Sequence, residues 1–520
     1  MKLLSYILLI LLVSTVSCKK FLETKPQDQL SPGNYYQTEA QLQTALAGTY
    51  DVLGQPLSTY NRDYITRMGT EADEGYYKQQ AFVSGPQVYN YSSSDALITD
   101  FWTSMYSGIS RANYLLANVD NNKSINDTVR AQVKGEALFL RAYYYFLLVQ
   151  TYGGVPLRLT PTASANETDV PRSTAREVYD RIVTDMEEAE PLVASIKTIG
   201  HAGRVNKSAV RGILARVYLS MAGAPINDVT KYDKAAFWAK KVMDDVEAGH
   251  ALIPSYEQVF INYAQDKYDI KESLWEVEFY GSSAIGQEYG LVGDIIGVPS
   301  SSDTYGRARG MIRTTAKLYQ SFEATDVRRD VTIANFNVNA NGTKTLITDV
   351  TPKGLYNRHV GKYRREWETL TPKATNNTPA NWPLLRYSDV LLMYAEAVNE
   401  VSGPTAEAHN ALNLVRVRAK ATPFTGAAVI TSKNVFKDVI IAERSRELAF
   451  EALRKHDLIR WGIFVPTMKN MLLRIDTEAP GSFFRIAYAN VTDKDILSPI
   501  PSGEFVLNTA IGQANQNPGW

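Results

Sequence analysis

Aromatic and charged side chains gather in three stretches of the sequence that lack a sustained helical or strand pattern. A tyrosine or tryptophan offers a flat apolar face with a polar tip, which suits stacking on a sugar ring as well as packing in a core. Because binding residues tend to lie on loops over a rigid frame, we expect some of these side chains to contact a ligand. The alternative for each is an ordinary packing role. The candidate binding residues are Tyr76, Tyr77, Tyr280, Tyr289, Asp303, Tyr305, Arg307, Arg309, Tyr363 and Trp367.

Residue patterns typical of catalysis are missing from the sequence. It contains no GxSxG elbow, no HExxH motif, no P-loop and no dinucleotide-binding fingerprint. The five histidines are scattered and no two have metal-ligand spacing, so we expect no metal site and no cofactor. A glycosidase needs two carboxylates about 5.5 Å or about 6.5–9.5 Å apart, and 55 acidic residues leave that alternative open.

The charge of the chain is balanced, with 55 lysines and arginines against 55 aspartates and glutamates. Nucleic-acid-binding proteins show a basic excess or a basic stripe, so we expect no nucleic-acid partner. Hydrophobic residues make up 45% and charged residues 21% of the 520 positions, which is the composition of a globular chain.

The first 18 residues have the pattern of a secretory signal. Met1 and Lys2 form a short positive region, Leu3 to Val13 are apolar apart from one serine, and Ser17 precedes Cys18. This resembles a bacterial lipoprotein signal, in which Cys18 becomes the acylated first residue. The alternative is an ordinary signal peptide with an incidental cysteine. Since Cys18 is the single cysteine of the sequence, acylation would leave no thiol for catalysis, disulfides or metal binding.

The stretch that must position everything else is an apolar run inside residues 132–157. From Ala137 to Val149 every residue is apolar or aromatic except Arg141, which predicts a helix buried on all sides. Gly153-Gly154 followed by Pro156 ends it. The run is too short to cross a bilayer, which needs about 20 residues. Arg141 requires a partner, and the candidate is Glu136.

Other helices are expected around this central one, and several pair by their apolar stripes. Small and aromatic residues alternate on the pair 207–221 and 231–246, as in tetratricopeptide repeats. On the pair 383–401 and 405–419, alanines permit close helix approach. Neither pair matches the full repeat signature, so both are degenerate repeats at best. We therefore predict a mainly α fold built on paired helices. The remaining predicted helices are 39–53, 98–119, 173–193 and 439–461, and the charges on the last of these are expected to form a solvated face.

A loop-rich insertion with short β-strands is predicted between the two groups of helices. Residues 274–279 alternate like a strand, and Asn341-Gly342 predicts a hairpin over 337–345. The predicted organisation is a signal peptide (1–17) followed by one domain (18–520). Within it, the scaffold covers about 38–275 and 383–462, the insertion about 276–382, and an extended C-terminal wrap 463–520.

Seven motifs in one order resemble the SusD/RagB family of surface lipoproteins. They are Cys18 followed by FLE, FLRAYYYFLLVQTYGGVPL (139–157), GRVNKSAVRGILARVYLSMAG (203–223), RYSDVLLMYAEAVNE (386–400), AERSRELAFEALRKHDLIRWG (442–462), LSPIPSGE (497–504) and the final QNPGW. Together they span nearly the whole chain, so the sequence is identified as a member of this family.

The resemblance implies a mainly α fold in which tetratricopeptide-like helix pairs form an α/α superhelical scaffold that cradles a loop-rich face. It implies a non-catalytic lipoprotein, anchored through lipid on Cys18, that binds glycans on the outer face of the outer membrane. It also implies a partner, a SusC-like TonB-dependent transporter on which the protein forms a lid. The shared motifs are structural, so the resemblance does not identify binding residues. Three alternatives stay open: a peptide-capturing lid as in some RagB-like members, a structural scaffold for protein partners, and a glycoside hydrolase.

Overall fold

A computed structural model describes residues 35–55, 59–68, 72–162, 164, 168–280 and 289–520. The predicted signal peptide and the predicted acylation site Cys18 lie outside the described residues. The longer helices are α3 (Glu39–Gly54), α4 (Ala96–Asn118), α5 (Asp127–Tyr152), α6 (Ala175–Leu192), α8 (Lys207–Ala222), α9 (Lys231–Met243), α10 (Tyr256–Ala264), α15 (Tyr387–Ser402), α16 (Ala406–Arg418), α17 (Lys433–Leu448), α18 (Arg454–Arg460) and α19 (Phe464–Glu478). Shorter helices are α7 (Ile196–Ile199), α11 (Val292–Ile295), α12 (Ala316–Ser321), α13 (Arg329–Thr332), α14 (Pro352–Leu355), α20 (Arg485–Ala489) and α21 (Glu504–Leu507). The strands are β1 (Gly75–Tyr77), β2 (Ser273–Val277), β3 (Ile312–Thr314), β4 (Phe336–Val338), β5 (Lys344–Leu346) and β6 (Trp382–Arg386).

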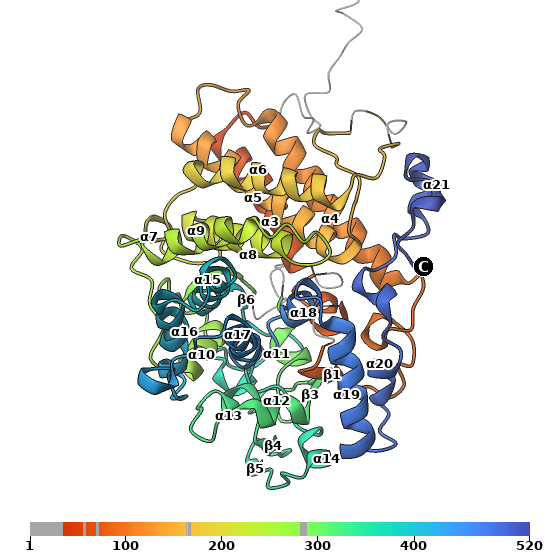
Figure 1. Ribbon diagram of the computed structural model, residues 1–520. Coiled ribbons are helices and arrows are strands. Elements are labelled where there is room, and N and C mark those ends of the chain that lie inside the picture. The colour runs from red at the N-terminus through yellow and green to blue at the C-terminus, as the bar shows by residue number, and fades with distance from the viewer. Residues whose placement is uncertain (1–34, 56–58, 69–71, 163, 165–167, 281–288) are drawn as a thin grey trace, which may run out of the picture.

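The long helices form one continuous stack. Helix α3 packs on α4, α4 on α5, α5 on α6, α6 on α8 and α8 on α9, and α9 then packs on α15, which contacts α16 and α17. Figure 1 shows the first helices of this stack in the upper half, with α15 to α18 below them and the short strands β3 to β5 lowest. The predicted fold, a mainly helical tetratricopeptide-like scaffold with short strands, is confirmed. The segment between α9 and α15 interrupts the stack.

Helix α5 is the buried centre of the stack, as predicted. Every residue from Gly135 to Val149 is buried. A Cβ on Gly108 of α4 would lie 2.5 Å from Cε2 of Tyr144, so a glycine is required there for the two helices to approach this closely. The Tyr144 hydroxyl donates to the carbonyl of Thr49 at 2.6 Å, which ties α5 to α3.

The predicted partner of Arg141 is wrong. Its Nε and Nη2 donate to the two carboxylate oxygens of Asp185 on α6, at 2.8 and 2.9 Å. Glu136 is bound instead by Arg204, at 2.8 Å, and by the Tyr50 hydroxyl, at 2.6 Å. Residues five apart lie on different faces of a helix, so Glu136 and Arg141 turn towards different neighbours.

Short antiparallel ladders hold the insertion to the scaffold. The predicted strand after residue 273 is confirmed and pairs with β6, and the predicted hairpin is confirmed as β4 and β5. The prediction that a helix begins at Pro383 is wrong, because residues 382–386 form β6 before α15 begins. Strand β1 pairs with β3, with Tyr77 opposite Ile312. This pairing places the segment after α3 beside the insertion.

Two predictions about the C-terminal part are wrong. The single helix over 439–461 is divided into α17 and α18, because Phe450 and Ala452 adopt positive φ values of 61° and 58° between them. The extended wrap over 463–520 contains α19, whose buried face packs on α18 and α20. One apolar core cluster reaches from Leu42 to Ile500. The bounds of the single domain stay a prediction.

The charged residues of α17 and α18 do not form the predicted solvated face. The six acidic and basic side chains concerned are all buried, namely Glu443, Arg444, Arg446, Glu447, Glu451 and Arg454. They pair with charges from other elements, so that Glu447 contacts Arg386, Arg418 and Arg328 at 2.6–3.1 Å. These arginines hold the pKa of Glu447 well below its usual value against the effect of burial. The charges join the scaffold helices to the insertion.

Candidate functional site

A cleft opens where the segment after α3 meets the insertion. The space in it that the centres of water molecules can occupy is about 290 Å³. Its lining combines aromatic, apolar and charged side chains from both segments: Arg62, Asp63, Thr66, Arg67, Tyr77, Gln79, Phe82, Ile295, Arg309 and Met311. Ligand pockets typically join apolar and aromatic walls to a few polar groups, so this cleft has the composition of a binding site.

Three elements position the lining. Thr66 and Arg67 lie on a π-helical turn, Tyr64–Met68, and such turns are frequent at functional sites. Tyr77 ends strand β1, and the β1–β3 ladder continues where the amide of Lys78 donates to the carbonyl of Met311 at 2.8 Å. Helix α11 holds the opposite wall, because the amides of Arg309 and Gly310 both donate to the carbonyl of Asp294.

A buried asparagine fastens the two walls to each other. The Asn61 side chain donates to the carbonyls of Gly54 and Tyr289, both at 2.9 Å, and accepts from the amide of Leu291 at 2.7 Å. Since Asn61 directly precedes Arg62, these bonds fix the start of the cleft against the backbone of the insertion.

An aromatic pair forms the apolar part of the cleft. The rings of Tyr77 and Phe82 meet edge to face, with centroids 5.7 Å apart and planes at 89°. The Arg67 guanidinium carbon lies 5.3 Å from the Phe82 ring centroid and 6.0 Å from that of Tyr77. Phe82 is 39% exposed and Tyr77 is half-buried. An exposed phenylalanine held in a fixed orientation offers a flat surface on which the apolar face of a ligand can stack.

Ion pairs form the polar part of the cleft. Arg62 binds Asp63 through both carboxylate oxygens, at 3.0 and 3.2 Å. Arg309 binds the buried Asp294, with its Nε 2.9 Å from Oδ2, and this bond raises the pKa of the Arg309 guanidinium. Both arginines keep part of their surface exposed, 36% for Arg62 and 49% for Arg309. They can therefore donate further hydrogen bonds to a ligand.

The arrangement suits binding better than hydrolysis. Asp63 is the single carboxylate among the described residues that line the cleft, and Arg62 holds it in an ion pair. Glycoside hydrolysis requires two carboxylates that act on one bond. The lining instead supplies an aromatic surface, a carboxylate acceptor and several guanidinium donors, which are the groups that orient a polyhydroxylated ligand.

The structure brings two of the predicted binding residues together in this cleft, Tyr77 and Arg309. For three others the predicted exposure on loops is wrong. Tyr76 is 3% exposed, stacks on Phe484 at 4.1 Å and donates to the carbonyl of Tyr356. Tyr305 packs with Phe336, and Tyr363 stacks on Trp382 at 5.2 Å. Successive side chains of a strand point to opposite faces, so β1 sends Tyr76 into the core and Tyr77 into the cleft.

The remaining predicted residues lie outside the cleft, and their role in binding stays a prediction. Asp303 and Arg307 form an exposed ion pair of 2.6 Å. Trp367 is half-buried with the Arg364 guanidinium 5.0 Å from its ring. Tyr280 is 45% exposed and Tyr289 half-buried, and their backbones form a β-bridge.

Sequence reasoning missed most of the cleft. Arg62, Asp63, Thr66 and Arg67 lie in a stretch without a recognisable pattern, and Gln79 lies beside the predicted Tyr77. Phe82 carried a usable signal, since Phe82-Val83 is an apolar pair inside a polar, glycine-containing stretch. Ile295 and Met311 come from the insertion, and only the fold brings them to the same place.

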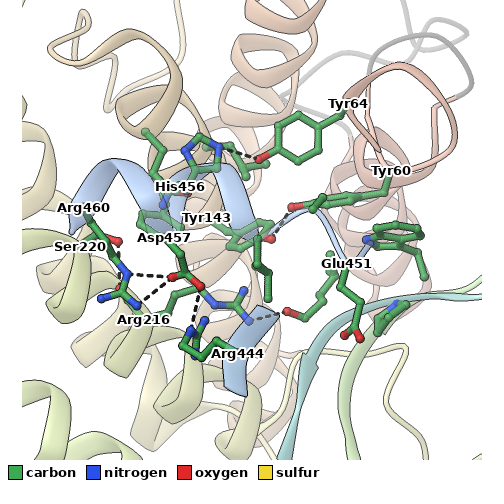
Figure 2. Close-up of a pocket in the computed structure, with 18 residues that line it drawn as sticks. Tyr60, Tyr64, Tyr143, Arg216, Ser220, Arg444, Glu451, His456, Asp457 and Arg460 are labelled. Carbon is green, nitrogen blue, oxygen red and sulfur yellow. Dashed lines mark hydrogen bonds and ion pairs between the residues drawn. The ribbon is translucent and has the colours of Figure 1, made fainter. Parts of the chain in front are cut away.

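A second, enclosed space lies inside the scaffold and is drawn in Figure 2. Water centres can occupy only about 30 Å³ there, which suits about one water molecule and no sugar ring. Its charges compensate one another, because Asp457 binds Arg444 and Arg460 at 2.8 Å each, and the Tyr60 and Tyr143 hydroxyls share a 2.6 Å hydrogen bond. We therefore assign this space to the scaffold.

The described residues offer neither a metal site nor a membrane-spanning helix. In the part of the chain that the structure describes, no three His, Cys, Asp or Glu side chains are grouped so that they could hold a metal ion. Within the same ranges, no helix has both the length and the hydropathy needed to cross a membrane.

Comparison with known proteins places the whole chain among related sequences. Residues 20–219 match a family described as "Starch-binding associating with outer membrane", and residues 326–520 match the SusD family. SusD-like protein P2 of Formosa agariphila is 26% identical, over 98% of this chain and 98% of its own length.

Solved structures share the fold. A SusD homologue from Bacteroides thetaiotaomicron superposes with a TM-score of 0.85 at 27% identity, and the match covers 94% of this chain and 98% of that one. Surface glycan-binding protein A from Bacteroides uniformis superposes with a TM-score of 0.69 at 25% identity, covering 92% of this chain and 99% of that one.

Proposed function

The chain belongs to the SusD/RagB family, and on that premise we propose that it captures a glycan at the outer membrane in the cleft beside Tyr77 and Phe82. Its role is binding without catalysis, in keeping with relatives that are named as binding proteins. The protein holds the glycan and leaves cleavage to enzymes.

The observation that carries this proposal is the exposed Phe82 ring, fixed edge to face by Tyr77 and flanked by Arg67. Sugar hydroxyls are well hydrated, so a hydrogen bond to them contributes only about 0.5–1.5 kcal/mol net. Stacking the apolar C–H face of a pyranose on an aromatic ring buries surface without leaving a polar group unpaired. Arg62 and Arg309 at the rim then orient the hydroxyls, because both guanidinium groups are partly exposed and held in place by carboxylates.

The proposal also covers how the protein is anchored and how it delivers the glycan. Cys18 carries lipid that anchors the protein in the outer membrane, and the protein acts as a lid on a SusC-like TonB-dependent transporter. The lipoprotein pattern that ends at Cys18 and the outer-membrane association in the description of the matching family support this role. Delivery to a transporter also gives a reason for a cleft that binds its ligand and does not change it.

A binding assay with product analysis tests the proposal. Protein lacking residues 1–18 is titrated calorimetrically with a panel of neutral and charged oligosaccharides, and with peptides as the ligands of the RagB-like alternative. The expected result is binding of at least one glycan, weakened about tenfold in Phe82→Ala, with no shorter product after hours. Peptide binding alone would establish the alternative, and shorter products that disappear in Asp63→Asn would establish a hydrolase.

A further inference from the structure

The cleft is positively charged although the whole chain has zero net charge. Its described lining contains three arginines, Arg62, Arg67 and Arg309, against one carboxylate, Asp63. Two of the arginines are compensated, Arg62 by Asp63 and Arg309 by Asp294 behind the wall. The third, Arg67, therefore decides the charge of the site.

Arg67 has neutral partners among the residues that the structure describes. Its Nε donates to the amide oxygen of Gln87 at 3.0 Å, and its guanidinium lies over the rings of Phe82 and Tyr77. No carboxylate of the described residues lies within 4.0 Å of it, and its two Nη groups have no hydrogen-bond acceptor there. Its planar, donor-rich end is thus held beside the aromatic surface without a counter-charge from any described residue.

The electrostatic surroundings of Tyr77 point the same way. Burial raises the pKa of the Tyr77 phenol, and the positive charges of Arg67, Arg309 and Arg62 oppose that rise while Asp63 adds to it. An anion at this position therefore meets three guanidinium groups, two of which are compensated by Asp63 and Asp294, so the net attraction comes from Arg67.

We propose that the ligand of this cleft is an anionic glycan, one that carries a carboxylate or a sulfate ester, with Arg67 as the residue that contacts the anionic group. This inference rests on the proposed glycan-binding function and adds the chemical class of the glycan. The sugar ring stacks on Phe82, and its acidic substituent reaches the guanidinium of Arg67, whose Cζ lies 5.3 Å from the centroid of the same ring.

A neutral sugar fits the site less well. Any ligand that stacks on Phe82 removes water from Arg67, and a neutral ligand returns only weak hydrogen bonds to a charge that has lost its hydration. A carboxylate or sulfate accepts two parallel hydrogen bonds from one guanidinium, and such charge-assisted pairs are about twice as strong as neutral ones. Because the cleft is open to solvent, the attraction is screened by salt.

The test compares matched glycans on the full-length protein in detergent. One arm pairs oligogalacturonate with its methyl ester, which removes the carboxylate charge, and a second pairs dextran sulfate with dextran. A panel of neutral, uronate-bearing and sulfate-bearing glycans tests sugar backbones other than galacturonan and dextran. We expect the tightest ligands to be anionic and to bind at least tenfold more weakly at 0.5 M than at 0.05 M NaCl. The two arms then distinguish carboxylate from sulfate.

Two variants of Arg67 separate the effect of its charge on binding from the effect of its guanidinium shape. Arg67→Gln should weaken binding of the anionic ligand about tenfold and flatten its salt dependence, whereas Arg67→Lys should keep most of the salt dependence. Arg485→Gln is the control, because Arg485 forms an exposed ion pair with Asp476 away from the cleft. Since Arg67 has no ion-pair partner among the described residues, its replacement leaves none of their carboxylates unpaired. The melting temperature of each variant checks that it folds.

The possible results distinguish this inference from its premise. Tight binding of neutral glycans only, unaffected by salt and by Arg67→Gln, would overturn the inference and leave glycan capture intact. Binding of no glycan on the panel would overturn both.

Discussion

Arg386 and Glu447 form a fully buried ion pair, with Nη1 2.9 Å from Oε1 and neither side chain exposed to solvent. Arg386 ends strand β6, which pairs with the strand that begins the insertion, whereas Glu447 lies in the last turn of α17. The same arginine also binds Glu272 and Glu451. One guanidinium therefore joins the residue before β2, the start of α15 and the α17–α18 break. Glu447 extends this network to the insertion, because it also binds Arg328 at 3.1 Å.

Replacing Glu447 by glutamine should strongly destabilise the protein. Three arginines converge on this carboxylate, and removing its charge breaks three buried ion pairs at once, which costs about 3–5 kcal/mol. Urea unfolding followed by circular dichroism measures the loss. Glu400→Gln is the control, because Glu400 pairs with two partly exposed lysines and its loss should cost about 1 kcal/mol or less. Equal effects of the two changes would contradict this view of the network.

The helical scaffold could be predicted because its helices carry local signals. The run that forms α5 is apolar on all sides, and the alternation before Phe279 and the Asn341-Gly342 turn are local patterns too. The burial of Glu443 and Glu447 could not be predicted, because opposite charges three and four residues apart look the same on a solvated helix. These carboxylates can be buried because arginines from other helices, strands and loops form ion pairs with them.

The binding site was only partly predictable for a similar reason. The sequence places Tyr76 and Tyr77 side by side, and nothing local says which of them faces the core. That choice follows from the pairing of β1 with β3 and from the packing of Phe484 on Tyr76. Arg309 reaches the cleft because its ion pair with Asp294 holds it there. This contact joins two segments of the insertion, and no short sequence motif predicts it.

Tyr144→Ala should lower the free energy of unfolding by about 3–5 kcal/mol, as for other large core aromatics. Tyr144 is fully buried, its ring packs against Gly108, and its hydroxyl bonds to the backbone of α3. Chemical denaturation measures the loss, and Tyr144→Phe serves as the control, because it keeps the ring and removes only the hydrogen bond. A loss below about 1 kcal/mol in the alanine variant would show that α5 is not the structural centre.

Acid should destabilise the protein through His456. Burial lowers the pKa of this histidine to about 3, whereas an unfolded histidine titrates near 6.5. The unfolded state therefore binds a proton that the folded state does not, so the contribution of His456 to stability is complete above about pH 6.5 and is lost progressively down to about pH 3. Between pH 6.5 and pH 5 the loss is about 2 kcal/mol.

His456→Gln isolates this effect. Glu276, whose pKa burial raises to about 7, titrates in the opposite sense but is present in both proteins, so it cancels in the difference. The variant should be less stable than the wild type at pH 7.5, and this difference should shrink by about 2 kcal/mol at pH 5. A difference that stays constant with pH would show that His456 is protonated in the folded protein.

The proposed anchoring and partnership can be tested together in cells that express a SusC-like transporter. A lid on a transporter must bury a sizeable surface, since stable interfaces bury about 1,200–2,000 Å². Mild detergent extraction should therefore co-purify a large β-barrel protein. If Cys18 carries the proposed lipid, Cys18→Ala should leave the membrane fraction, because the variant has no site for the acyl chains. Retention of that variant in the membrane fraction without a bound transporter would contradict lipid anchoring. Consistent recovery of the wild type without a β-barrel protein would contradict its role as a transporter lid.

The neighbours Tyr76 and Tyr77 give the sharpest test of the division between core and cleft. Tyr76→Ala should lower the free energy of unfolding by about 3–5 kcal/mol, because its ring is stacked on Phe484 inside a second core cluster. Tyr77→Ala should leave the melting temperature nearly unchanged and weaken glycan binding about tenfold, or about 1.4 kcal/mol. The reason is that Tyr77 holds Phe82 edge to face, so its loss frees the ring on which the ligand stacks. Calorimetric titration and thermal unfolding of both variants, with Trp367→Ala as a half-buried aromatic outside the cleft, separate the two effects. Normal binding by Tyr77→Ala together with weakened binding by Trp367→Ala would move the site to the far side of the insertion.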